Sequence, residues 1–100
     1  MTNENDEALL PGAEIVTEGL KDLARGRVIE SALLVLIAAP RLRGLGIPVP
    51  DRPSDRPHEH ALYKLLEQRL GTGAHSFYNS LIRRIVSYEH ALEREQSRNS

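Results

Sequence analysis

Two stretches of the chain place apolar residues every three or four positions, with polar residues between them. In the first, from Ala13 to Arg25, the apolar series is Ile15, Val16, Leu20, Leu23 and Ala24. In the second, from Pro57 to Leu70, it is Ala61, Leu62, Leu65, Leu66 and Leu70. This spacing is typical of amphipathic helices that bury one face. We therefore predict a first helix over residues 13–25 and a third over residues 57–70.

A glycine lies inside the first predicted helix. Gly19 weakens a helix by about 1 kcal/mol relative to alanine, so its presence there needs a compensating reason. Because glycine has no side chain, this position would allow a neighbouring helix to approach closely.

The helix predicted from Arg27 to Ala39 is apolar on nearly every side after Arg27, with Glu30 and Ser31 as its polar exceptions. A helix of this kind is stable only when it is buried on all sides, so we predict that it is the central helix. An apolar run rich in valine and isoleucine could also form a buried strand. We prefer a helix because the chain offers no second strand-like segment for pairing. Pro40 should end this helix or kink it.

The fourth predicted helix runs from Ala74 to Glu95 and is the longest. Its apolar residues follow a heptad pattern, at Ala74, Tyr78, Leu81, Ile85, Tyr88 and Leu92. A regular seam of this kind packs against another long helix. Because only one other long apolar helix is predicted, we expect part of the seam to contact a partner molecule.

The segments between and beyond these helices are polar or rich in proline. Residues 44–57 hold four of the six prolines of the chain, which predicts an extended linker between helices two and three. Residues 1–10 predict a disordered acidic tail and residues 96–100 a frayed polar end. The sequence therefore predicts an all-α fold, a small domain over residues 11–95 that resembles a four-helix bundle.

Composition and charge limit the kinds of site that the protein can contain and the location that we expect for it. The chain has 100 residues, a formal net charge of −1 and no cysteine, which excludes disulfides and thiolate metal sites. The N-terminal residues are acidic rather than basic and apolar, and the longest apolar run, Ala32 to Ala39, is too short to span a membrane. We expect a cytoplasmic protein that does not bind membranes.

Four histidines raise the question of a metal site. His58 and His60 are two residues apart and point in different directions on a helix, whereas His75 and His90 lie near opposite ends of the fourth helix. No His-Glu-x-x-His pattern is present. We predict no metal and no cofactor, with the histidines at the surface or at helix ends.

A polar stripe runs along the fourth predicted helix, where Ser76, Asn79, Arg83, Ser87 and His90 are three or four residues apart. Arg83 and His90 lie on nearly the same line of the helix. Their order and spacing resemble the Arg-x(4–6)-His arrangement of HEPN ribonucleases, which are small helical dimers. That resemblance would imply that the arginine stabilises a phosphate oxyanion and the histidine transfers a proton. Arg84 departs from the polar residue expected after the arginine, and a solvated helix face produces the same pattern.

Basic residues are concentrated in the middle of the chain. Arg25, Arg27, Arg41 and Arg43 could bind phosphate if the ends of the first two helices converge. No aromatic residue is interleaved with them, which argues against a surface that stacks single-stranded bases. Ordinary surface arginines are the preferred interpretation, with nucleic-acid binding as an alternative.

Among these candidates, apolar recognition has the most support in the sequence. No motif for a nucleophile, a phosphate-binding loop or a pair of catalytic carboxylates is present. We therefore predict a non-enzymatic helical protein-interaction module that forms a homodimer. Aromatic and aliphatic anchors dominate interface energies, so the predicted interface residues are those of the fourth helix: Phe77, Tyr78, Leu81, Ile85 and Tyr88.

Overall fold

The computed structural model describes residues 10–52 and 56–98, and these residues form helices, turns and loops with no strand. The all-α class predicted from the sequence is confirmed. The helices are α2 (Ala13–Ala24), α3 (Glu30–Ile37), α4 (Ala39–Gly44), α5 (His58–Leu70) and α6 (Ala74–Arg98), with a 3-10 turn, η1 (Gly71–Gly73), before α6.

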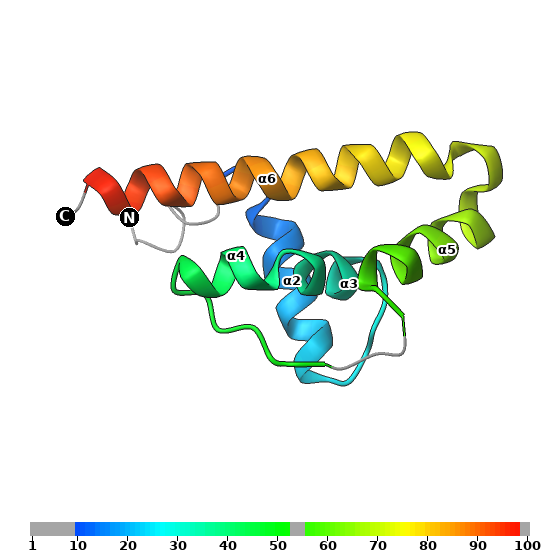
Figure 1. Cartoon of the computed structure of the whole chain (residues 1–100), viewed down its shortest axis with the longest axis horizontal. Helices are drawn as coiled ribbons and strands as arrows, with labels where there is room; N and C mark the ends of the chain where they lie inside the picture. The colour runs from blue at the N-terminus through cyan, green and yellow to red at the C-terminus, as the bar shows by residue number, and fades with distance from the viewer. Residues whose placement is uncertain (1–9, 53–55, 99–100) are drawn as a thin grey trace.

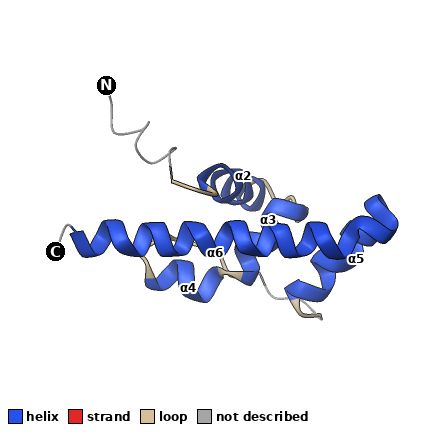
Figure 2. Cartoon of the chain, turned by 90° about the horizontal axis from the view of Figure 1, so that it is seen from above, coloured by secondary structure: helices blue, strands red, loops and turns tan. Residues whose placement is uncertain are grey.

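The longest helix, α6, lies across one side of the other four. In Figure 1, α6 runs the length of the molecule, α2 crosses beneath it at a steep angle, and α4 follows its direction. Figure 2, seen from above α6, places α2 on one flank and α4 on the other. One long face of α6 therefore packs on the rest of the chain, and the opposite face is turned to solvent.

The core is aliphatic and centres on α3. Every residue from Ala32 to Leu36 is buried, as the all-round apolar pattern predicts. The largest buried side chains come from four helices: Leu34 and Val35 of α3, Leu42 of α4, Leu62 and Leu66 of α5, and Ile85 of α6.

The segment predicted as one second helix differs from the prediction at both ends. Its first apolar pair, Val28 and Ile29, precedes α3 and is 39% and 44% exposed, so the expectation that this pair is buried is wrong. The helix is also interrupted at Ala38, and Pro40 lies in the first turn of α4. Proline has no amide hydrogen to continue the α3 ladder, whereas the first turn of a new helix needs none.

α2 and α3 lie close together at Gly19. A Cβ atom at this position would lie 2.5 Å from the carbonyl oxygen of Ser31 and 2.5 Å from Cγ2 of Val35. The prediction that glycine allows close approach of another helix is therefore confirmed.

The residues between α4 and α5 contact the core at several points. Val49 is buried, and Ile47 packs beside the core. The Arg43 Nε group donates a hydrogen bond to the Val49 carbonyl oxygen at 3.0 Å, and Arg52 donates to the Leu23 carbonyl oxygen at the end of α2. This segment is therefore tied to α2 as well as to α4.

Both chain ends extend past the described residues. The predicted acidic tail, apart from Leu10, lies outside them, as do residues 99 and 100. α6 continues through Arg98, three residues beyond its predicted end. Within the described part of the chain, no helix has both the length and the apolar character needed to cross a bilayer.

Candidate functional site

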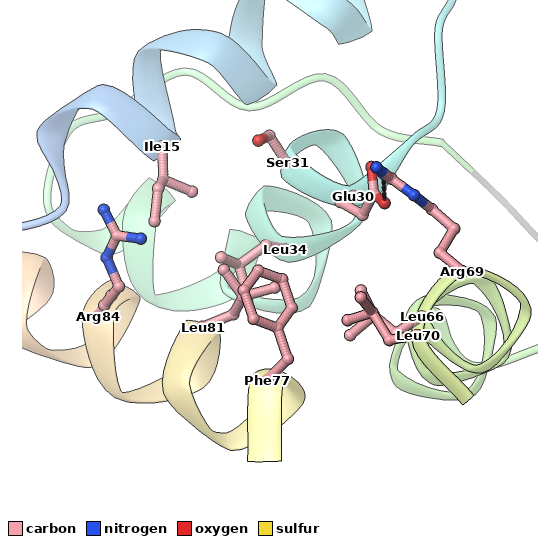
Figure 3. A pocket seen from close by; sticks show the side chains of 10 residues that line it. All are labelled: Ile15, Glu30, Ser31, Leu34, Leu66, Arg69, Leu70, Phe77, Leu81 and Arg84. Carbon is pink, nitrogen blue, oxygen red and sulfur yellow. Dashed lines mark hydrogen bonds and ion pairs between the residues drawn. The ribbon is translucent and has the colours of Figure 1, made fainter. Parts of the chain in front are cut away.

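An apolar groove of about 330 Å³ opens between four helices. Its floor consists of side chains that are less than a tenth exposed: Ile15 of α2, Leu34 of α3, Leu66 of α5 and Leu81 of α6. These residues belong to the same helix faces that build the core. The groove is therefore a place where the core reaches the surface (Figure 3).

Two large apolar side chains stand at the edge of the groove. Leu70, the last residue of α5, is 45% exposed, and Phe77, in the first turn of α6, is 44% exposed. The short η1 turn holds both residues on the same side, and Figure 3 shows the Phe77 ring in front of Leu34 and Leu81. A partner molecule can thus contact an exposed aromatic ring and an apolar hollow together.

Ion pairs flank the groove on two sides. An Arg84 Nη atom of α6 lies 2.6 Å from a carboxylate oxygen of Glu14 on α2. Arg69 of α5 pairs with Glu30 at the start of α3, as the dashed line in Figure 3 marks. These pairs connect α2 to α6 and α3 to α5, and their opposite charges leave the rim without net charge.

Two further exposed apolar residues precede Glu30 in the chain. Ile29 directly precedes this groove residue, and Val28 precedes Ile29, in the extended segment before α3. Together with Leu70 and Phe77, this pair accounts for four of the five large apolar residues that are exposed in the described chain. We call the groove, with Leu70 and Phe77 at its edge, the groove face.

The five predicted interface residues divide into two groups. Leu81, Ile85 and Tyr88 are less than a tenth exposed because other helices of the same chain cover them. Phe77 remains accessible on the groove face. Tyr78 is half-buried on the other flank of α6, where its ring lies 5.5 Å from that of Tyr63 between centroids. Burial, together with the negative charge of Glu59, raises the pKa of Tyr78.

The arginines predicted to bind phosphate lie in two separate regions. Arg25 and Arg27 are exposed after the end of α2, whereas Arg41 and Arg43 belong to α4, away from that loop in Figure 1. Arg41 pairs with Glu93 at 2.8 Å, and Arg43 is held by the Val49 carbonyl oxygen. The fold therefore does not converge these four side chains on one phosphate.

Arg83 and His90, the pair that resembles the HEPN arrangement, are both exposed on the solvent side of α6. Neither side chain lines the groove. Another histidine of α6, His75, contacts Asn79 and the Tyr63 ring. Within residues 10–52 and 56–98, no group of three or more acidic or histidine side chains is placed to hold a metal ion.

A second hollow, of about 520 Å³, lies between α2 and the C-terminal half of α6. Apolar residues such as Val16, Leu20 and Leu92 line it, and Glu14 and Glu18 make its rim acidic. None of the large apolar residues that are exposed in the described part of the chain borders this hollow. It lacks the projecting anchor that distinguishes the groove face.

Several groove residues were not predicted as functional. The spacing of Ile15, Leu34 and Leu66 predicts that they belong to the core, but it does not show where the core opens to the surface as a groove. Leu70 had a signal in the sequence: an apolar residue at the end of a helix, directly before Gly71, often lies at the edge of a core.

Comparison with protein-family models, curated proteins and solved structures finds no match to this chain.

Proposed function

We propose that the protein is a non-enzymatic helical interaction module that self-associates through the groove face. The observation that carries this proposal is the exposed Phe77 ring at the edge of an apolar hollow. Large apolar surfaces that remain exposed on a small domain commonly mark interaction sites, and aromatic anchors contribute most to interface energies.

Self-association is favoured because the groove face is complementary to itself. A two-fold axis brings the same patch of two copies together, so a projecting side chain and the hollow that receives it must lie on one surface. Phe77 and the groove meet this condition. The rim adds no like-charge repulsion, because Arg84 and Arg69 are each paired with a glutamate.

The expected dimer is weak. Covering the exposed 44% of Phe77 removes about 70–110 Å² from water, which contributes about 2–3 kcal/mol. Two copies double this gain, but association costs at least about 4 kcal/mol in lost translational and rotational freedom. Phe77 alone therefore roughly balances that cost, and contacts by Leu70 and by the walls of the groove must supply the remainder. A cytoplasmic location stays a prediction.

Sedimentation velocity between about 1 and 100 μM, the range in which a weak interface is detected, tests the proposal. We expect the parent chain to shift from monomer to dimer within this range. Phe77→Gln should keep the chain monomeric by removing the anchor.

Val86→Gln provides a matched control. Val86 is also on α6 and is 37% exposed, but it does not line the groove. The control should dimerise like the parent. A parent chain that stays monomeric throughout, or a Phe77→Gln variant that dimerises as well as Val86→Gln, would refute self-association through this face.

A further inference from the structure

The solvent side of α6 carries a continuous polar stripe. Its residues are separated by intervals of four, three, four, three and four positions, so they share one face of the helix. All six are exposed: Ser76, Ser80, Arg83, Ser87, His90 and Arg94. No other described helix covers this side of α6 in Figure 1 or Figure 2. We call this surface the α6 stripe.

The α6 stripe is cationic although the chain as a whole has a net charge of −1. α6 has three acidic residues, and none lies on the stripe: Glu93 pairs with Arg41, Glu95 pairs with Arg98, and Glu89 is buried. Arg83 and Arg94 form none of the ion pairs found in the described part of the chain. Their charges are therefore available to an anionic partner.

The residue types on the stripe indicate the chemistry of that partner. Arginine and serine side chains are common donors to the phosphate oxygens of nucleic acids. The six stripe residues include no apolar or aromatic side chain, and the exposed apolar residue beside Arg83 and His90, Val86, is a single small side chain. The stripe therefore lacks the large anchors of a protein interface and the apolar face of a membrane-bound helix. The lack of aromatic residues also disfavours stacking on single-stranded bases.

We propose that the α6 stripe binds the phosphate backbone of double-stranded nucleic acid. Arg83 and Arg94 are eleven residues apart, which separates them by about 16 Å along the helix axis. The major groove of B-form DNA is about 12 Å wide, so the two arginines can reach phosphates on opposite sides of it. Three polar side chains near the two arginines can donate further hydrogen bonds: Ser80 lies one turn before Arg83, and Ser87 and His90 lie between Arg83 and Arg94.

The charge available sets the expected strength of binding. Two arginines that neutralise two phosphates give a slope of about −1.8 in a plot of log affinity against log salt concentration. Affinity should therefore fall about tenfold between 50 and 200 mM salt. The contacts follow the backbone, so binding should depend little on base sequence.

Fluorescence anisotropy with labelled DNA and RNA duplexes of about 20 base pairs, which are longer than α6, tests the proposal on the full chain. We expect the parent to bind at low salt, and Arg83→Gln/Arg94→Gln to lose at least tenfold in affinity together with most of the salt dependence. The matched control is Arg25→Gln/Arg27→Gln, which removes the same charge from the exposed loop after α2 and should bind like the parent.

Four results would overturn the proposal. The parent could bind neither duplex at low salt, or both double variants could lose the same amount of affinity. Single strands could bind more tightly than duplexes, or polyglutamate could displace the duplex when its carboxylate concentration equals the phosphate concentration. The last two results would indicate base stacking or an acidic protein partner. Phe77→Gln should retain duplex binding, which separates this test from that of self-association.

Discussion

Replacing Gly19 with alanine tests how closely α2 and α3 approach each other. The new Cβ atom would lie 2.5 Å from the Ser31 carbonyl oxygen and 2.5 Å from Val35 Cγ2. Ordinary contacts begin well beyond 3 Å. Because the Ser31 oxygen belongs to the backbone of the central helix, α3 itself must shift, and rotation of one side chain cannot relieve the clash.

Two opposing effects set the magnitude. Alanine is more favourable than glycine in a helix by about 1 kcal/mol. Overpacking a core by one methyl group costs about 1–3 kcal/mol, and two contacts this short, one of them to backbone, place Gly19 at the upper end. We expect a net loss of about 2 kcal/mol in the free energy of unfolding, which lowers the Tm by about 8–16 °C in a domain of this size.

Thermal and urea unfolding followed by circular dichroism at 222 nm measures the effect. Gly44→Ala is the matched control, because Gly44 is also helical but a Cβ atom added there would meet no neighbouring atom within 4 Å. The control should be stabilised, by up to about 1 kcal/mol. If Gly19→Ala is as stable as the parent, helix propensity outweighs packing here and the approach of α2 to α3 is looser than 2.5 Å implies.

Two further predictions concern buried side chains. Burial raises the pKa of Glu89, and the charges of Arg41 and His90 oppose part of the rise. Protonated Glu89 therefore stabilises the folded state fully below the ordinary pKa of 4.5. This contribution to stability is lost as the pH rises through the folded-state pKa of Glu89. Glu89→Gln should therefore have a higher Tm than the parent at pH 7 and the advantage should disappear near pH 4, whereas a lower Tm at pH 7 would show that the carboxylate is stabilising. Leu34→Ala should lower the free energy of unfolding in urea by about 2–5 kcal/mol, since Leu34 is fully buried, and a loss below about 1 kcal/mol would mean that the groove floor collapses to fill the space.

The amphipathic helices were predictable from the sequence within a few residues. α2, α5 and α6 each have one apolar face, so their periodicity marks both the helix and the side that is buried. The central segment was harder, because an all-round apolar pattern has no phase that locates its first turn. Whether Ile29 starts the helix or lies exposed before it depends on contacts with other segments.

The candidate site was only partly predictable for a related reason. Heptad spacing identifies Leu81 and Ile85 as apolar contact residues, but it does not show whether their partner is the same chain or another. Phe77 lies at the edge of that seam, and only the position of α5 and η1 leaves it exposed. Likewise, Arg25 and Arg41 are close in sequence, but the course of α3 between them separates them in space.

Because the groove draws its walls from α2, α3, α5 and α6, it exists only when segments from both ends of the chain have assembled. A molecule that occupies it binds the native state and not the unfolded chain, so it shifts the folding equilibrium of the whole domain. At a concentration one hundred times its Kd, such a molecule would add about 2.7 kcal/mol to the free energy of unfolding. Thermal-shift screening can therefore detect an occupant of the groove without an activity assay.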